Sequence, residues 1–554
     1  MKHITFLLAI ALSALTATVA AQRMPSHINK LLNAQYAITS LYVDTVNEDK
    51  LVEDAIKGML EKLDPHSSYT DAKETKEMEE PLQGEFSGIG IQFNMKQDTL
   101  YIIQTIPGGP SERVGILAGD RIIFVNDSLI AGVKMKNTDI MKRLRGKKGT
   151  KVNVKIKRSN SDELITFRIT RDKIPIHSID AEYMLDDNTG YIRISRFGAK
   201  TYDEMMEALN HLKEQGMQQL IMDLSDNGGG YLNAAIDMCN EFLDKGQLIV
   251  YTEGDKSPRS EANAFGNGRY KQLPMVVIVN QYSASAAEIF SGAMQDWDRA
   301  IVVGRRSFGK GLVQRPIRFD DGSMMRLTVA RYYTPSGRCI QKPYTKGNKK
   351  EYEDDLADRN KSGEYYCLDS IHFNDSLRYT TLLNHRPIYG GGGIMPDIFV
   401  PVDTAEWTTY YRDMMAKGII NQFAIDYVDR HRNDIKKSYP TLTDFDNKFS
   451  LTEQDMKRFI DMGDKDKVKF DEEKYKTSER MFKLIIKGLI ARDVYADPAA
   501  YTRIINHRNP DLDAAMAVLN DKQRFNRLLN EGNPEYERLA KEHHQADKKN
   551  DSEK

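Results

Sequence analysis

Cysteine is scarce in this chain, and the residue patterns that bind metals or nucleic acids are missing. The three cysteines, Cys239, Cys339 and Cys367, are too few for a disulfide framework, and neither a CxxC nor an HExxH motif occurs. Basic and acidic residues balance at 79 against 80, so the basic excess typical of a nucleic-acid-binding protein is absent. We therefore expect no metal, no other cofactor and no nucleic-acid partner. Whether Cys339 and Cys367 form a disulfide stays open.

Long apolar runs are also lacking after residue 21. The one such run, residues 4–21, follows Lys2 and His3 and ends in small residues, which is typical of a secretory signal peptide cleaved near Ala20 or Ala21. A membrane anchor is the alternative, but the run is short for a span and contains the polar residues Ser13, Thr16 and Thr18. We expect a protein exported across the inner membrane, periplasmic, and soluble or associated with the membrane through partners.

A chain of 554 residues is expected to form several domains. After the signal peptide (1–21), helical spacing of apolar residues marks an N-terminal helical region (22–80). Short strands and glycine-rich turns fill residues 81–175. Apolar strands alternate with amphipathic helices in residues 176–402, which predicts an α/β core with a largely parallel sheet, although 340–385 look irregular. Residues 403–554 read as a charged helical extension that is disordered from about His543. For this extension, dimerisation and docking of an adaptor protein both stay open.

Three short segments carry the chemistry. Residues 283–288 (SASAAE) supply a serine at the start of a predicted helix, and residues 308–314 (FGKGLVQ) supply a lysine between glycines. Residues 226–230 (DNGGG) form a glycine-rich turn after a buried strand. A hydroxyl, an amine and exposed backbone amides are the nucleophile, base and oxyanion site that acyl transfer requires.

A lysine serves as a base only when neutral, and burial in an apolar pocket lowers its pKa toward that state. Lys310 has Phe308 and other apolar residues near it in sequence. Gln314 falls on the same side of a strand or helix as Lys310, so its amide oxygen is placed to hold the amine. We therefore predict that Ser285, Lys310 and Gln314 act together.

Backbone amides are the expected oxyanion donors. The N–H of Ala286 opens the predicted helix, where the helix dipole favours negative charge, and Gly229 or Gly230 supplies the second donor. Simpler interpretations compete with each motif taken alone. Residues 285–288 also match a helix capping box, Lys310 also suits a solvated loop, and the glycines also suit a tight turn. Ser283 is a rival nucleophile.

Together and in this order, the three segments resemble the C-terminal processing (tail-specific) serine peptidases. That family shows an NPGG-like turn, a serine–alanine repeat followed by glutamate, and an FGKG-x-VQ segment. The resemblance covers roughly residues 35–402, including the segments 63–69 and 394–397. Its spacing of 25 residues between nucleophile and base selects Ser285 over Ser283. It implies a crotonase-like α/β core shared with the Clp protease subunit.

Two departures from the family pattern stand out. Gly228 replaces the usual proline of the turn, which makes the oxyanion turn more flexible. Arg305 and Arg306 stand where an acidic and a small residue are common. If these arginines lie close to Lys310, their charge favours its neutral form.

The segment 84–172 resembles a PDZ domain inserted before the catalytic core. Ser87-Gly88-Ile89-Gly90 looks like its carboxylate-binding loop, and Gly115 to Asp120 like its characteristic turn. PDZ domains bind a free chain terminus by adding it as a strand to a sheet edge. Ile89, Ile91 and either Ile140 or Leu144 line the pocket or belong to the core.

The sequence thus predicts an exported serine endopeptidase with a Ser285/Lys310 dyad. Its substrates are polypeptides with free C-terminal tails that the PDZ domain selects. Two alternatives remain, which are a catalytically inactive PDZ scaffold or chaperone of the cell envelope, and a serine hydrolase that acts on a substrate other than a peptide.

Overall fold

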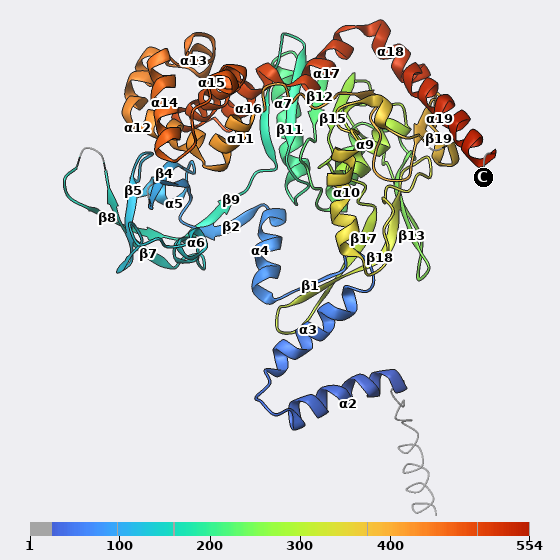
Figure 1. Cartoon of the computed structure of the whole chain (residues 1–554), viewed down its shortest axis with the longest axis horizontal. Coiled ribbons are helices and arrows are strands. Elements are labelled where there is room, and N and C mark those ends of the chain that lie inside the picture. The colour runs from blue at the N-terminus through green and yellow to red at the C-terminus, as the bar shows by residue number, and fades with distance from the viewer. Residues whose placement is uncertain (1–24, 97, 159–160, 374, 496, 553–554) are drawn as a thin grey trace, which may run out of the picture.

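The structure is a computed structural model that describes residues 25–552 except 97, 159–160, 374 and 496 (Figure 1). The expected signal peptide lies outside the described residues. The described chain contains a layered core of helices and sheet, a β-rich unit beside it, and helical regions toward both ends. This arrangement confirms the predicted α/β class with terminal helices.

A mostly parallel sheet lies at the centre of the core. Its strand order is β10-β11-β12-β15-β16-β21, in which only the β10–β11 pair is antiparallel. All five residues of β15 are buried, as expected for a parallel strand with helices on both faces. The bounds are β10 (Ile179–Met184), β11 (Thr189–Ile194), β12 (Gln219–Asp223), β15 (Met275–Val279), β16 (Ile301–Gly304) and β21 (Ile398–Phe399).

Helices from distant parts of the chain cover the two faces of this sheet. One face buries α7 (Thr201–Glu214), α8 (Leu232–Asn240) and α9 (Ala286–Asp296). The other face packs against Leu512 and Leu528, which come from α17 (Pro510–Asn520) and α18 (Lys522–Glu531). The C-terminal region, expected to be an extension after residue 402, therefore supplies one layer of the core.

A second, antiparallel sheet continues from the loop that carries Lys310. β17 and β18 form one hairpin of this sheet, and β13 and β14 form another, in which β14 is polar and largely exposed. The order is β1-β18-β13-β14, with β17 on β18. The bounds are β1 (Ser68–Thr70), β13 (Leu248–Gly254), β14 (Ser257–Asn263), β17 (Leu312–Arg318) and β18 (Met324–Tyr333).

The β-rich unit has its own apolar core and a sheet of order β3-β4-β5-β7-β8, with β6 beside β5. Its first and last strands, β2 (Glu85–Gly88) and β9 (Asp172–Pro175), pair with each other and connect the unit to the core. The other elements are β3 (Ile91–Lys96), β4 (Thr99–Thr105), α5 (Pro110–Arg113), β5 (Arg121–Val125), β6 (Ser128–Leu129), α6 (Asn137–Leu144), β7 (Lys151–Lys157) and β8 (Ile165–Thr170).

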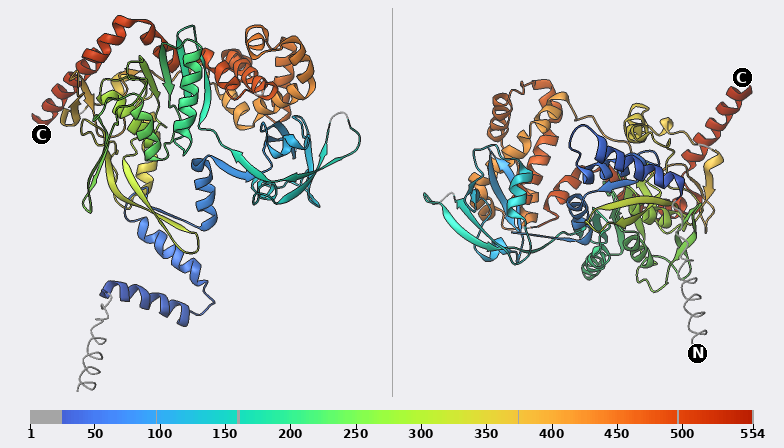
Figure 2. Two further views of the ribbon diagram at one scale, coloured as in Figure 1. Left: turned by 180° about the vertical axis from the view of Figure 1, so that it is seen from behind. Right: turned by 90° about the horizontal axis from the view of Figure 1, so that it is seen from below.

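The N-terminal region is helical, as predicted. It contains α2 (Ser26–Leu41), α3 (Glu48–Leu60) and α4 (Ala72–Gln83), the last of which starts at a capping box of Asp71 and Glu74. No residue of α2 is buried, and α2 projects away from the body of the molecule (Figures 1 and 2).

Six helices after residue 408 form a separate apolar core above the β-rich unit (Figure 2). Ile425 of this helical unit packs against Tyr101 and Ile103 of the β-rich unit, and Asp429 pairs with Arg121. The helices are α11 (Thr409–Ala416), α12 (Ile419–Ser438), α13 (Leu442–Lys448), α14 (Glu453–Lys465), α15 (Glu472–Val494) and α16 (Ala500–Ile505).

Two segments are more ordered than expected. The stretch 340–385 contains α10 (Lys349–Lys361) and the strand β19 (Arg378–Thr380), which pairs with β20 (Pro387–Tyr389). The tail, expected to be disordered from about His543, is helical as α19 (Pro534–Ser552). Tyr536 and Leu539 anchor its first turns in an apolar cluster with Phe373, and strong helix formers follow. The three cysteines are all free.

A buried ion pair fixes the C-terminal layer to the core, and its loss is expected to destabilise the fold. Both oxygens of Asp511 accept hydrogen bonds of 2.9 Å from Arg305, and the two side chains are only 12% and 10% exposed. Asp511→Asn removes the charge that offsets Arg305 and should lower the free energy of unfolding by about 3–5 kcal/mol. Denaturant titration measures this change.

The matched control is Asp54→Asn, because Asp54 pairs with Lys50 on the surface, with both side chains more than half exposed. Such pairs contribute little, so this variant should unfold like the wild type. Equal stability of Asp511→Asn and Asp54→Asn would contradict the role given to the buried pair.

Candidate active site

Ser285 lies in a strained turn between β15 and α9. Its backbone has φ 56° and ψ −113°, a conformation that is rare for any residue except glycine. Such a strand-to-helix turn presents a serine side chain at the edge of a sheet, as in the nucleophile elbow of α/β-hydrolases. The local geometry therefore suits a nucleophile.

Ser283 has a structural role. Its hydroxyl is fully buried, donates to the carbonyl of Leu224 at 2.7 Å and accepts from the N–H of Asn280 at 2.9 Å. A hydroxyl used in this way is not available to a substrate.

Lys310 lies in the loop between β16 and β17, where glycines allow a close approach of chain segments. A Cβ on Gly311 would lie 2.3 Å from the backbone nitrogen of Gln341, and Gly309 has φ +85°. Burial lowers the pKa of Lys310, and the charge of Arg326 lowers it further, whereas Glu288 opposes the change. The loop therefore holds an amine whose neutral form is favoured.

One buried carboxylate joins the two loops. Oε2 of Glu288 accepts the backbone N–H groups of both Ser285 and Lys310, each at 2.8 Å. Oε1 accepts the N–H of Gly309 at 2.7 Å and the hydroxyl of Ser307 at 2.5 Å. The backbone nitrogens of Ser285 and Lys310 therefore lie no more than twice 2.8 Å apart, although 25 residues separate them.

Glu288 was expected only as the end of the serine–alanine repeat and as part of a capping box. Its side chain is fully buried, and burial raises its pKa while the four donated hydrogen bonds oppose the rise. Glu288 is the one charged residue between Ser283 and Gln295 in the sequence. A lone acid in an apolar helix is a signal that could have identified it.

The glycine turn packs directly on the nucleophile. A Cβ on Gly229 would lie 2.8 Å from the Cβ of Ser285, so only glycine fits there. The N–H of Gly229 already donates to Asn227 Oδ1 at 2.8 Å. Among the described residues, the N–H groups of Gly230 and Ala286 have no hydrogen-bond partner, which leaves these two of the three predicted oxyanion donors available.

Gln314 lies on β17, opposite Thr328 of β18. Its amide nitrogen donates to the carbonyl of Leu312 at 2.9 Å and to the hydroxyl of Thr328 at 3.4 Å. No hydrogen bond joins Gln314 to Lys310 in the part of the chain that the structure describes. Its role in holding the amine stays a prediction.

The segment 63–69 adds residues near the base. Asp64 accepts hydrogen bonds from Ser67 and Thr328, which ties this segment to β18. The ring of His66 contacts the hydroxyl of Tyr352 at 2.8 Å. Burial and the nearby Lys310 charge lower the pKa of His66 to about 3, so the imidazole is neutral near pH 7.

Arg305 and Arg306 do not supply free positive charge to the base. Arg305 pairs with Asp511 of α17, and Arg306 pairs with Glu364 at 2.7 Å. The expected influence of these arginines on Lys310 was therefore wrong. The charge that lowers the pKa of Lys310 comes from Arg326 on β18.

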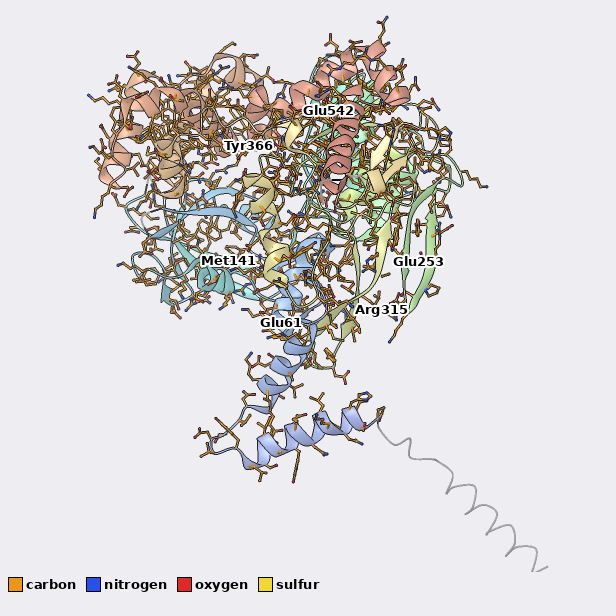
Figure 3. All side chains as sticks on the ribbon, turned by 45° about the vertical axis from the view of Figure 1, so that its right-hand side comes forward. Glu61, Met141, Glu253, Arg315, Tyr366 and Glu542 are labelled. Atoms are coloured by element: carbon orange, nitrogen blue, oxygen red, sulfur yellow. The ribbon has the colours of Figure 1, made fainter. Side chains whose placement is uncertain are left out.

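The β-rich unit contains an apolar groove at the expected loop. A cavity of about 130 Å³ lies beside the edge strand β3 and the helix α6, where Figure 3 labels Met141. Four of the five predicted residues line it, whereas Ser87 borders a different cavity and Ile140 belongs to the core. The lining residues are Phe86, Gly88, Ile89, Gly90, Ile91, Phe93, Met141, Leu144 and Arg145.

No metal site accompanies this arrangement within the described ranges, because they contain no group of three or more histidine, cysteine, aspartate or glutamate side chains that could hold an ion. A hydroxyl, a buried amine and two free backbone donors lie on adjoining turns. Such a set supports acyl transfer through a covalent intermediate.

Four family profiles match the chain. Peptidase family S41 matches residues 188–350, a PDZ domain matches 87–169, and the N-terminal domain of the activating protease CtpB matches 11–75. A family of unknown function matches residues 410–497.

Known proteases align with more than half of this chain. The carboxy-terminal processing protease CtpA of Bacillus subtilis is 38% identical over 334 residues, which cover 60% of this chain and 70% of that protein. The carboxy-terminal-processing protease of Bartonella bacilliformis is 35% identical over 308 residues, which cover 55% and 70%. A solved photosystem II D1 C-terminal processing protease is 28% identical, with a TM-score of 0.33 over 57% of this chain and 91% of its own. The chain therefore belongs to peptidase family S41 and is a carboxy-terminal processing serine protease.

Proposed function

We propose that this protease cleaves polypeptides near their C-termini with Ser285 as nucleophile and Lys310 as base. The observation that carries the proposal is the shared carboxylate of Glu288, which holds the backbone of both residues on one oxygen. Burial and Arg326 favour the neutral amine that a base must be.

In the proposed reaction, the neutral amine of Lys310 takes the proton of Ser285 as the hydroxyl oxygen bonds to the substrate carbonyl carbon. The N–H groups of Ala286 and Gly230 stabilise the oxyanion, and Gln314 orients the amine. The Lys310 ammonium then gives its proton to the leaving nitrogen as the peptide bond breaks. Water, deprotonated by Lys310, releases the acyl group and restores both residues.

The PDZ unit is proposed to select substrates by their tails. The edge strand β3 leaves backbone groups open for an added strand, and the cavity beside it accepts an apolar side chain. Backbone amides of residues 88–90, which line the cavity, are the proposed partners of the terminal carboxylate. This assignment fits a protease that acts on C-terminal tails.

Export to the periplasm is part of the same proposal and rests on the apolar run 4–21 with its small C-terminal residues. In the described part of the chain, no helix has the length and apolarity needed to cross a membrane.

Replacing the proposed nucleophile or base should abolish cleavage. Ser285→Ala and Lys310→Ala are each expected to lower kcat at least about 1000-fold for a fluorogenic peptide with a free C-terminus. Lys361→Ala is the control, because Lys361 is 74% exposed in a surface ion pair. Cleavage by Lys310→Ala at the wild-type rate would contradict the assignment of the base.

The pH dependence of cleavage should report the ionisation of Lys310. The base works only when deprotonated, so kcat/KM rises with pH through the pKa of Lys310 and is lost as the pH falls below it. Because that pKa is lowered, the rising limb should lie below the usual lysine value of 10.5. A limb at or above 10.5 would exclude a neutral Lys310 as the base.

Tail selection should depend on a free carboxylate and an open groove. Amidation of a peptide's C-terminus is expected to weaken its binding to the Ser285→Ala protein at least about tenfold in calorimetry. Met141→Glu, which puts a charge in the groove, should weaken binding similarly, whereas Thr166→Glu on the exposed side of β8 should not. Equal binding of free and amidated peptides would contradict tail recognition.

A further inference from the structure

Arg326 lies on β18 close to the proposed base. It pairs in register with Ser68 of β1 and Pro316 of β17, and its Nη2 donates to the hydroxyl of Ser68 at 3.2 Å. Thr328, two residues further along β18, accepts a hydrogen bond from the side chain of Gln314 on β17. The side chains of Thr328 and Gln314 therefore lie on the same face of the hairpin. Since residues two apart on a strand share a face, Arg326 points to the side that carries Gln314.

The guanidinium of Arg326 has no acidic partner. Its Nε is buried without a hydrogen-bond partner, and no ion pair with an aspartate or glutamate forms within the described residues. The nearby Asp64 is occupied, because its two oxygens accept hydrogen bonds from His66, Ser67 and Thr328.

Buried arginines elsewhere in the core have acidic or carbonyl partners for their guanidinium groups, although Nε of Arg338 also lacks a hydrogen-bond partner. Arg338 and Arg386 pair with aspartates, and Arg299 donates to three backbone carbonyls. A buried cation without such partners is costly unless a ligand compensates it. Arg326 is thus a half-buried positive charge, beside the proposed base, with donors to spare.

The surroundings of Arg326 are cationic. Its charge acts on both Lys310 and His66, lowering the pKa of each. Lys342 also acts on His66, although it is neutralised by Asp355 at 2.7 Å. An anion entering this part of the site would therefore be attracted.

We propose that Arg326 is a substrate-binding residue that pairs with a carboxylate of the polypeptide being cleaved. The inference rests on the proposed function and names a recognition element within the same site. A planar guanidinium binds a carboxylate through two parallel hydrogen bonds, which fixes the position of the ligand. That carboxylate comes either from an acidic side chain or from the C-terminus of the tail.

The test uses one peptide that the wild type cleaves, with a free C-terminus and a single glutamate after the cleaved bond. Two derivatives each lack one carboxylate, one by amidation and one by replacement of glutamate with glutamine. KM and kcat are measured above the rising limb of the pH profile, where Lys310 is deprotonated in every variant. The variants are Arg326→Gln, Arg326→Lys, which keeps the charge, and Arg315→Gln, which removes an exposed arginine from the adjacent strand (Figure 3).

For the wild type and Arg315→Gln, one of the two derivatives should raise KM at least about tenfold. In Arg326→Gln that difference should disappear, because the parent peptide already binds weakly, and Arg326→Lys should retain part of it. If the amidated peptide shows the rise in KM, the carboxylate is the C-terminus. If the glutamine peptide shows it, the carboxylate is the glutamate side chain. If a derivative still raises KM in Arg326→Gln, the carboxylate that it lacks is bound by the PDZ unit.

The proposal is overturned if Arg326→Gln distinguishes both derivatives from the parent peptide as strongly as the wild type does. It is also overturned if neither derivative affects the wild type. Failure of the proposed function is separate, because it would appear as undiminished cleavage by Ser285→Ala in the same series.

Discussion

The carboxylate of Glu288 is the contact on which the arrangement of this site depends. Four donors from two loops converge on its two oxygens, inside a helix whose residues are all buried. Removing a charged group from water is costly, and four hydrogen bonds are the compensation that makes the burial tolerable. Because the backbones of Ser285 and Lys310 share one oxygen, the turn of the nucleophile and the loop of the base are held in one geometry.

Segments beyond residue 350, where the match to peptidase family S41 ends, support the same loop. Arg305 and Arg306 precede the FGKG segment, and their partners are Asp511 of the C-terminal layer and Glu364, which follows α10. Each of the two residues that depart from the family pattern is thus paired with a carboxylate from another segment of the chain. The helices after residue 508 are best understood as part of the catalytic core, with α11–α16 as a separate unit that contacts the PDZ domain.

Much of the core could be predicted from sequence because its strands are short apolar runs, such as β15, and the glycines mark tight turns. The β13–β14 hairpin was not predicted because its second strand is polar and exposed. The C-terminal layer and the order in α19 depend on apolar contacts with segments more than 100 residues away, as between Tyr536 and Phe373. Arg326 could not be singled out from the sequence either, because only the structure reveals that it has no acidic partner among the described residues.

The most direct test of the account is the rate at which a fluorophosphonate probe labels Ser285 in Glu288→Gln. The side chain of glutamine has only one acceptor oxygen, and its NH₂ group is a donor. At least two of the four groups that donate to Glu288 therefore lose their acceptor. We predict labelling at least about 100-fold slower than in the wild type, with secondary structure and PDZ peptide binding unchanged. The exposed Glu353→Gln, whose carboxylate forms only a surface pair, should label normally. Labelling of Glu288→Gln at the wild-type rate would contradict the claim that this carboxylate holds the site together.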